Sequence, residues 1–402
     1  MILRLAHFCT LLLPGTCLLL PSSQSGAQLG GEVLVVRHGG RYTGRFTSPN
    51  SAVPCVLIKT AEPVVLDGCT LHGAGDLIVA EPGARLTVRN CRGYGLTPSA
   101  DNISRGRFLS ATEARSLRVE HNYFEHTIGI LVYRWGGDGS VAQTLTVRYN
   151  RVRNIDGRYR NGEADATASF LGLNQVRGVA GIDISYNEVV NEPNQCATGD
   201  VVNFYNSSGT ARSPIRFFHN YIQGAYPYPA TAPHYTGTGL TTDGDGVSAL
   251  TTTAYVEAAY NQIVSTCNAA MNIAAGHHNR FHHNRMVTSG LLPDGQVLKA
   301  TYAATSIFNA YRQPKTVFFG NRVDHNVIGY AKPGYQVPAA NRHDLSSGNC
   351  TGCTDNEHLP NPITLATEQQ EWQRWQHKLQ RRGIRLPSAQ ARHPPFRPLA
   401  QR

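Results

Sequence analysis

Apolar and polar positions alternate in a unit that recurs along the chain. In residues 182–224 the unit reads apolar, any, apolar, any two, Asn, any, apolar, and it returns after 33 residues. Alternation at period 2 is typical of a half-buried strand, and Asn suits the turn because it tolerates positive φ. We assign the turn of the unit to Asn122, Asn150, Asn187, Asn220, Asn261 (after one extra residue), Asn284 and Asn321.

A second type of extended run lies between the copies of this unit. We place these runs at 130–135, 168–174, 200–205, 246–250, 271–275 and 307–311. Two strand types that alternate over roughly 23 to 41 residues indicate a coil wound many times about one axis. Hairpin signals such as Asn-Gly are few, which disfavours a sandwich or a propeller. The pattern therefore predicts an all-β fold, a single-stranded right-handed parallel β-helix.

The ends of the chain differ from this repeating middle. Residues 1–27 have one Arg, an apolar run and a small-residue cleavage site, which predicts a signal peptide, and hence a secreted or periplasmic protein. We expect the β-helix over 28–361, a C-terminal helix packed on it over 362–387, and a disordered basic tail over 388–402. Later residues contain no apolar run long enough for a transmembrane segment.

The predicted helix has its own signals. Thr367 and Gln370 are spaced as a capping box, and Gly383 can end the helix. Trp372, Trp375 and Leu379 follow at i, i+3 and i+7, so we expect them to form an apolar stripe on the solenoid.

Charge and cysteines narrow the function classes. The net charge is +10, but eight Lys or Arg and no acid lie in 374–402, so residues 28–373 carry only +1. The body therefore gives no signal for nucleic acid.

Seven cysteines follow the predicted signal peptide, an odd number. Cys69 and Cys91 stand one coil apart and should stack, and Cys350 and Cys353 have the spacing of a local disulfide rather than a zinc site.

Together the signal peptide, the Asn-centred units and phrases such as NYFEHTIGI (122–130), GDVVNFYNSSGT (199–210) and AAGHHNRFHHNRMV (274–287) resemble secreted proteins of the pectate-lyase-like superfamily. The resemblance covers about residues 33–331. It implies a right-handed parallel β-helix and similarity to polysaccharide lyases such as chondroitinase B and alginate lyases. That superfamily also includes polygalacturonases and many members without known activity, and fold alone does not fix function.

Long loops enter one class of strand, at 157–167, 191–199 and 223–246. Loops on a rigid scaffold commonly carry function, and the Tyr residues of the last loop suit an aromatic wall. Because coils stack about 4.8 Å apart, residues distant in sequence can converge on one sheet. We therefore expect a groove for an extended sugar chain, with substrate contacts from Tyr133, Arg134, Asp200, Asn203, Asn272 and Asn309.

Two kinds of chemistry are open in that groove. Asp243 and Asp245 would point to one face of an extended strand and could serve as acid and base in glycoside hydrolysis, although Asp-Gly-Asp-Gly is also an ordinary turn. In a lyase, an Arg such as Arg134 would neutralise a uronate carboxylate while a base removes a proton. The further catalytic candidates are His277, Arg280 and Lys299.

The sequence favours β-elimination on an extracellular, uronic-acid-containing polysaccharide. The alternatives are a glycoside hydrolase using Asp243 and Asp245, or a non-catalytic glycan-binding surface protein. We expect a monomer. We predict no metal site, because the four His at 277–283 do not share a face. The sequence leaves any cofactor undefined.

Overall fold

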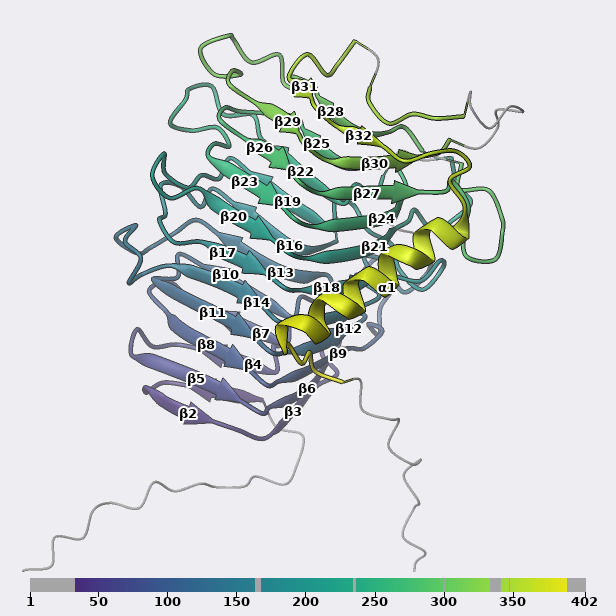
Figure 1. The fold of residues 1–402 in the computed structure, drawn as a ribbon. Helices are drawn as coiled ribbons and strands as arrows, with labels where there is room; N and C mark the ends of the chain where they lie inside the picture. The colour runs from purple at the N-terminus through teal and green to yellow at the C-terminus, as the bar shows by residue number, and fades with distance from the viewer. Residues whose placement is uncertain are drawn as a thin grey trace, which may run out of the picture.

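The chain winds into a stack of coils whose strands form three parallel sheets (Figure 1). The computed structural model describes residues 33–162, 168–233, 236–299, 301–332, 341–346 and 348–388. The predicted signal peptide and residues 389–402 of the predicted tail lie outside this part. Each full coil contributes one strand to each sheet, so the fold is the predicted parallel β-helix, with a helix near its C-terminal end.

We name the three sheets A, B and C in the order in which a coil visits them. Sheet A contains β1 (Leu34–Val36), β4 (Val56–Ile58), β7 (Ile78–Ala80), β10 (Leu109–Thr112), β13 (Gly129–Tyr133), β16 (Ser169–Asn174), β19 (Val202–Tyr205), β22 (Leu240–Asp243), β25 (Ala269–Ile273) and β28 (Ala303–Ile307). Sheet B contains β2 (Gly40–Tyr42), β5 (Pro63–Asp67), β8 (Arg85–Arg89), β11 (Ser116–Glu120), β14 (Leu145–Arg148), β17 (Asp183–Ser185), β20 (Ile215–Phe218), β23 (Val256–Ala259), β26 (Arg280–His282), β29 (Arg322–Asp324) and β31 (Cys353–Thr354). Sheet C contains β3 (Arg45–Ser48), β6 (Thr70–Gly73), β9 (Arg92–Gly95), β12 (Tyr123–Glu125), β15 (Arg151–Arg153), β18 (Glu188–Val190), β21 (Tyr221–Ala225), β24 (Gln262–Thr266), β27 (Arg285–Thr288), β30 (Val327–Tyr330) and β32 (Glu357–His358).

The inward side chains of the three sheets form one continuous core along the axis. Ile184, Phe217, Ala258 and Phe281 pair in register from coil to coil and are all fully buried. Burial of such columns removes apolar surface from water at every coil, which is the main stabilising term of the stack.

A ladder of Asn side chains runs inside the corner between sheets B and C. Asn187 donates its Nδ2 to Val147 O (2.9 Å) and to Asn220 Oδ1 (2.9 Å), and its own Oδ1 accepts from Asn150 Nδ2 (2.9 Å). Every polar atom of this fully buried amide is thus bonded. The same contacts link Asn122, Asn150, Asn187, Asn220, Asn261, Asn284, Asn326 and Asn356.

The residue before each ladder Asn makes the sharp bend of this corner. It has positive φ, for example 54° at Tyr186 and 57° at His219, although neither is Gly. The left-handed conformation costs such residues roughly 1–2 kcal/mol each. Their rings stack in sequence, with centroids 4.8 to 5.7 Å apart, along His121, Tyr149, Tyr186, His219, Tyr260, His283 and His325. Ring stacking and the amide ladder together offset the strain of the bend.

Two of the predicted strands are wrong. Residues 246–250 and 307–311 lie mainly in loops, and the strands of those coils are β22 and β28. Thr242 of β22 occupies the inward position that pairs with Phe204 and Ile273 in the neighbouring coils. Because Thr is polar, the alternation of apolar and polar residues is hidden in the sequence of β22. The apolar Val247, in contrast, is 84% exposed. The coil also has three strands rather than two, because the short run after each Asn forms sheet C.

Two ladder assignments need correction. The last-but-one rung is Asn326 and not Asn321, which instead bonds Asn279 N at a neighbouring corner. The unit at Asn261 has no extra residue, because Val256 pairs directly with Ile215. Aromatic residues outside the strands, Tyr255 and Phe319, obscured the two registers in the sequence.

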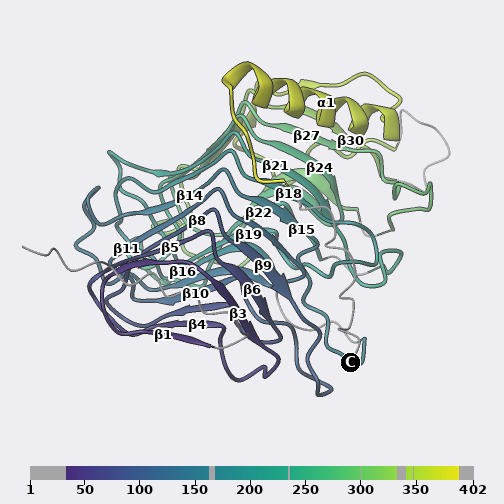
Figure 2. The same cartoon turned by 90° about the horizontal axis from the view of Figure 1, so that it is seen from below.

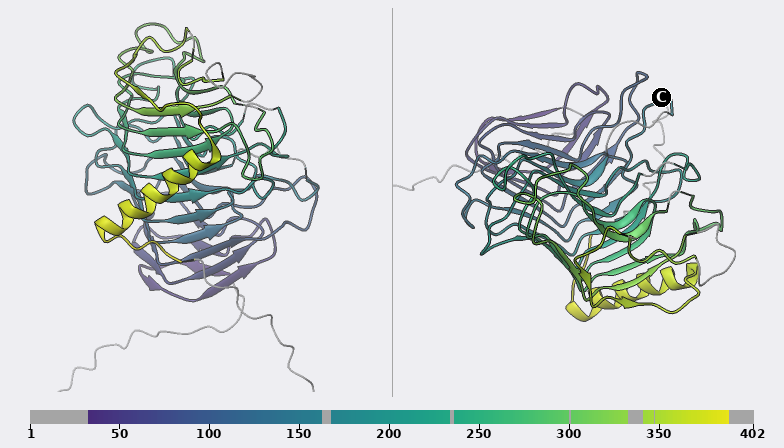
Figure 3. Two further views of the ribbon diagram at one scale, coloured as in Figure 1. Left: turned by 45° about the vertical axis from the view of Figure 1, so that its right-hand side comes forward. Right: turned by 90° about the horizontal axis from the view of Figure 1, so that it is seen from above.

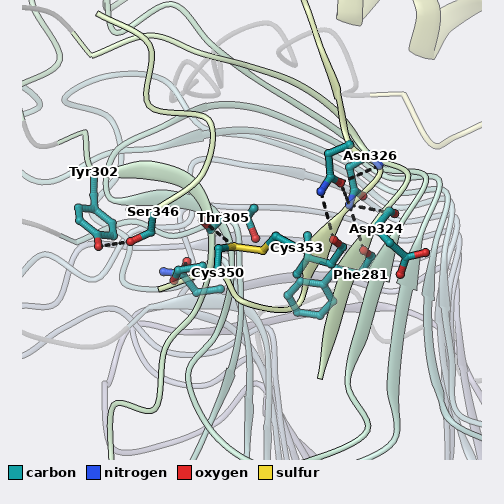
Figure 4. The surroundings of a disulfide bond; sticks show 12 residues. Phe281, Tyr302, Thr305, Asp324, Asn326, Ser346, Cys350 and Cys353 are labelled. Carbon is teal, nitrogen blue, oxygen red and sulfur yellow. Dashed lines mark hydrogen bonds between the residues drawn. A yellow bond between two sulfur atoms is a disulfide. The ribbon is translucent and has the colours of Figure 1, made fainter. Parts of the chain in front are cut away.

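The cysteines follow the coil geometry. Cys91 N donates to Asn122 Oδ1 (2.9 Å), so Cys91 takes the place of an Asn at the start of the ladder. Cys69 has the same place in the preceding coil, because the residues after the two cysteines, Thr70 and Arg92, pair in register, which confirms the predicted stack. At the other end Cys350 and Cys353 form the predicted disulfide (Figure 4), close to Asn326 and its bond to Phe281 O (3.0 Å).

The C-terminal helix α1 (Leu365–Arg382) crosses the outer face of sheet C (Figures 2 and 3). Its capping box is formed by Thr364 and Thr367, one turn earlier than predicted, whereas Gly383 ends it as predicted. No helix in the described part of the chain has the length and apolar character to span a bilayer.

The helix is seated on one outward row of sheet C, formed by Glu188, Tyr221, Gln262 and Arg285. Trp375 donates Nε1 to the fully buried Glu188 (2.8 Å) and stacks on Tyr221 with centroids 5.8 Å apart. Glu371 accepts from Arg285 (2.8 Å) and Gln262 (3.0 Å). The expected Trp and Leu stripe is thus joined by buried polar contacts.

Replacing Asn187 by Leu should lower the free energy of unfolding by at least ~2 kcal/mol, since each buried polar group left without a partner costs about 1–3 kcal/mol. Asn356→Leu is the matched control at the half-exposed end of the ladder, where water can replace the lost bonds. Urea unfolding followed by circular dichroism measures both variants. Equal losses would contradict a structural role for the ladder.

Removing residues 388–402 should leave the melting temperature unchanged, whereas a chain that ends at Ile363 should melt earlier and aggregate. The longer deletion exposes Tyr221 and leaves the buried Glu188 without the indole of Trp375. Thermal melting and size-exclusion chromatography compare the two chains. Identical melting and solubility would show that the helix is dispensable.

Candidate functional site

Several predicted site residues meet on the outer face of sheet A, at the end of β22. Tyr133, Asn174, Tyr205 and Asp243 occupy the same register position on β13, β16, β19 and β22, so they form one outward row. The neighbouring row contains Asn203 on β19. Long loops from sheet C enter these strands, as the sequence predicted for one side of the solenoid.

Asp200 and Asp243 share one amide group. Asn203 donates Nδ2 to Asp200 Oδ2 (2.8 Å) and to Asp243 Oδ2 (3.1 Å). The other oxygen of Asp243 accepts from Gly244 N (3.0 Å). Although 40 residues separate Asn203 from Asp243 in sequence, the coil geometry holds the two carboxylates side by side.

The two carboxyl groups have different environments. The pKa of Asp200 is raised to about 6, chiefly by burial and also by the negative charge of Asp243, while hydrogen bonds from Asn203, Thr238 and Thr241 act in the opposite direction. Such a group keeps its proton in mildly acidic solution. A carboxyl group of this kind beside a hydrogen-bonded carboxylate can serve as a general acid.

Asp245 lies just beyond the strand and is exposed. Asn206 donates Nδ2 to its Oδ1 (2.8 Å), and this bond, with a second from Tyr205, lowers its pKa. The exposed Arg177 acts on it in the same direction. Asp243 and Asp245 thus belong to one cluster, but they contact different partners and do not form the direct pair that an extended strand would give.

The loop that follows β28, two coils beyond β22, brings a second tyrosine to the cluster. Tyr311 comes close enough to Asp243 for this carboxylate, together with burial, to raise the pKa of the Tyr311 hydroxyl. Gln313, which is 7% exposed, fixes the loop by donating Nε2 to Gly246 O (2.9 Å) and Thr252 Oγ1 (2.9 Å). Asn309 closes the same turn by bonding the backbone of Gln313, so its amide is used within the loop.

Asn272 and the Tyr133 and Arg134 pair flank the cluster. Asn272 stands beside Thr241 in the row of Asn203 and accepts from Ser306 Oγ (2.8 Å). Arg134 lies over the ring of Tyr133 and pairs with Glu113 at 3.5 Å. Two strands of sheet A, β16 and β19, lie between this pair on β13 and Asp243 on β22.

The remaining catalytic candidates lie elsewhere. His277 is 3% exposed, and its two ring nitrogens contact His278 Nδ1 and Ala249 O, both at 2.9 Å. Arg280 stands on sheet B and binds both oxygens of Asp324, at 2.9 and 2.6 Å. Lys299 is exposed in the loop between β27 and β28. Among the described residues, no hydrogen bond or ion pair joins these three residues to the carboxylates of sheet A, although His277 contacts Ala249 in the loop that follows Asp245.

Tyr226 and Tyr228, in the loop before β22, do not form the expected aromatic wall. Tyr226 is fully buried in a small second core and its hydroxyl bonds Ser265 Oγ (2.9 Å). Tyr228 packs against Arg158, with the guanidinium carbon 4.8 Å from the ring centre. Tyr235 lies outside the described residues.

Sequence reasoning missed Tyr205, Asn206, Arg177 and Tyr311. The register of sheet A would have identified Tyr205, which pairs with Asp243, and Asn206, which follows it. Tyr311, in contrast, comes near Asp243 only through the folding of a loop. Within the described ranges, no group of three or more His, Cys, Asp or Glu side chains is arranged to hold a metal ion.

No family model matches the chain, and no curated protein is similar to it in sequence. Among solved structures, the alginate lyase AlyF-OU02 in complex with G6 is similar over 85% of this chain and 82% of that one, with 12% sequence identity and a TM-score of 0.29. A superposition this weak indicates neither substrate nor reaction. The resemblance to the pectate-lyase-like superfamily therefore holds at the level of the parallel β-helix, which follows from the three sheets themselves.

Proposed function

We propose that this protein is an exported carbohydrate-active enzyme that hydrolyses a glycosidic bond of an extracellular polysaccharide on the outer face of sheet A. One observation carries the proposal: the Asn203 amide binds Asp200 and Asp243 together, at 2.8 and 3.1 Å, while burial raises the pKa of Asp200 to about 6. Glycoside hydrolysis needs one protonated and one ionised carboxyl group on either side of the scissile bond. Export rests on the predicted signal peptide.

In this scheme the Asp200 carboxyl donates its proton to the glycosidic oxygen as the bond to the anomeric carbon breaks. The Asp243 carboxylate, oriented by Asn203 and Gly244, acts on the anomeric carbon or deprotonates the water that adds to it. Water is consumed and a new reducing end is formed. The rings of Tyr205 and Tyr311 stand beside the carboxylates as surfaces for sugar rings.

β-Elimination, which the sequence favours, is the second candidate, and Arg177 near Asp245 is the observation for it, since a cation must neutralise the uronate carboxylate. A base is harder to find there. The pKa values of Tyr205 and Tyr311 are raised, so both hydroxyls hold their protons. Lys299, Arg280 and His277 make no contact with the carboxylates among the described residues, and both nitrogens of His277 are already in contact with His278 and Ala249. For this reason we rank hydrolysis first.

Asp200→Asn and Asp243→Asn should each lower kcat by about 100-fold or more, because a positioned acid or base contributes 10²–10⁴ in rate. Asp183→Asn on sheet B is the matched control and should keep full activity. Reducing-end release from a panel of neutral and uronic-acid polysaccharides measures hydrolysis, and the ultraviolet absorbance of an unsaturated product measures elimination. Activity retained in both site variants, with melting temperatures unchanged, would refute the proposal.

The value of kcat/KM should fall as pH rises through about 6, because Asp200 then loses the proton it must donate. Nuclear magnetic resonance of the carboxyl carbon can follow the same titration directly. In Asp243→Asn the pKa of Asp200 should decrease, since the neighbouring negative charge is gone. An activity that increases steadily above this pH would instead support elimination by a base.

A further inference from the structure

A cleft of about 490 Å³ lies between the helix α1 and the corner of sheets B and C, away from the carboxylates of sheet A. Its walls come from the helix on one side, through Arg374, Lys378 and Arg381, and from the corner on the other, through His219, Gln262 and Arg285. Figure 3 shows the helix crossing the strands that form its floor. The volume is in the range of small-ligand sites.

The cleft is strongly cationic. Four Lys or Arg side chains line it, and none of the described residues that line it is acidic. The nearest carboxylate, that of Glu371, already binds Arg285 through both oxygens, and Arg374 stands 3.6 Å from it. Arg381 pairs with no carboxylate among the described residues. One carboxylate thus faces four cations, and an anion in the cleft would offset the positive charge that Glu371 alone leaves uncompensated.

The pKa of Lys378 is lowered by burial and by the neighbouring cations. Burial, with the nearby cations Arg285, Arg381 and Arg382, lowers its pKa to about 8, although Glu371 acts in the opposite direction. Its ammonium group donates to Tyr260 O (3.0 Å) and lies 5.7 Å from the Trp375 ring centre. A bound anion would restore the preference of this lysine for its charged form.

Two buried polar atoms in the wall have no partner. Gln262 is 2% exposed, and its Oε1 receives no hydrogen bond from the described residues, although its Nε2 bonds Glu371. The Nδ1 of His219 is likewise buried and unpartnered. Burial and the nearby cations lower the pKa of His219 to about 4, so the ring is neutral. Buried polar groups are nearly always bonded, so these two atoms keep a hydrogen-bonding capacity that a hydroxyl group could use.

From this combination we infer that the cleft binds an acidic, polyhydroxylated ligand, a sugar bearing a carboxylate or a sulfate. The anionic group would contact Arg374, Lys378 and Arg381, and a hydroxyl would donate to Gln262 Oε1. The site is separate from the carboxylate cluster, so it does not depend on the reaction proposed there.

Binding can be measured by isothermal titration and by the fluorescence of Trp375, on the full chain carrying Asp243→Asn so that no probe is cleaved. The probes are a uronic-acid trisaccharide, a sulfated disaccharide, the matching neutral trisaccharide and inorganic phosphate. We expect at least one acidic sugar to bind, more tightly than phosphate, with no binding of the neutral sugar. The two acidic sugars distinguish a carboxylate from a sulfate.

The double variant R374Q/R381Q should weaken binding of the acidic sugar by about tenfold or more, because two charge-assisted contacts are lost. Both side chains lie at the surface of the helix, so melting should not change. Arg45→Gln, on the exposed side of β3 in the first coil, is the control and should bind as the parent does. Full affinity in R374Q/R381Q, equal binding of the neutral sugar or of phosphate, or no binding of any acidic sugar would each overturn the inference.

Discussion

The Asn ladder is the interaction on which the rest of the structure depends. A coil that must turn sharply between sheets B and C places a non-glycine residue at positive φ, and the buried backbone at that bend needs hydrogen-bond partners. Each ladder amide supplies them by bonding its neighbours in the coils before and after it. Because every rung needs the next, the ladder fixes the registers of sheets B and C and stacks the outer rings in one line.

The regularity of that corner leaves the other two corners free to vary. Connections into and out of sheet A differ in length from coil to coil, whereas the turn between sheets B and C stays short. Loops can therefore enclose the outer face of sheet A without disturbing the core. The cluster around Asp243 shows the consequence, since its partners Asn203 and Tyr311 come from different coils and from a folded loop.

The C-terminal helix lies on the outer face of sheet C. Its contacts with sheet C combine an apolar centre with buried charges, of which Glu188 is paired with Arg151 (2.9 Å) and Arg153 (3.0 Å) as well as with the indole of Trp375. A buried carboxylate is tolerated only when it is paired in this way. The same arrangement orients the basic side of the helix toward the stacked rings, which creates the cationic cleft.

The sequence by itself determined the repeat, because the alternation of apolar residues and the spacing of Asn are local properties, as are the end of the helix at Gly383 and the disulfide of Cys350 with Cys353. It could also assign Asp200, Asn203 and Asp243 to one sheet. It could not predict that the Asn203 amide joins Asp200 to Asp243, that Trp375 contacts Glu188, 187 residues away in the chain, or that Arg280 belongs to sheet B. Those contacts depend on how many residues each loop inserts before its strand, and only the packed coils convert loop length into neighbours in space.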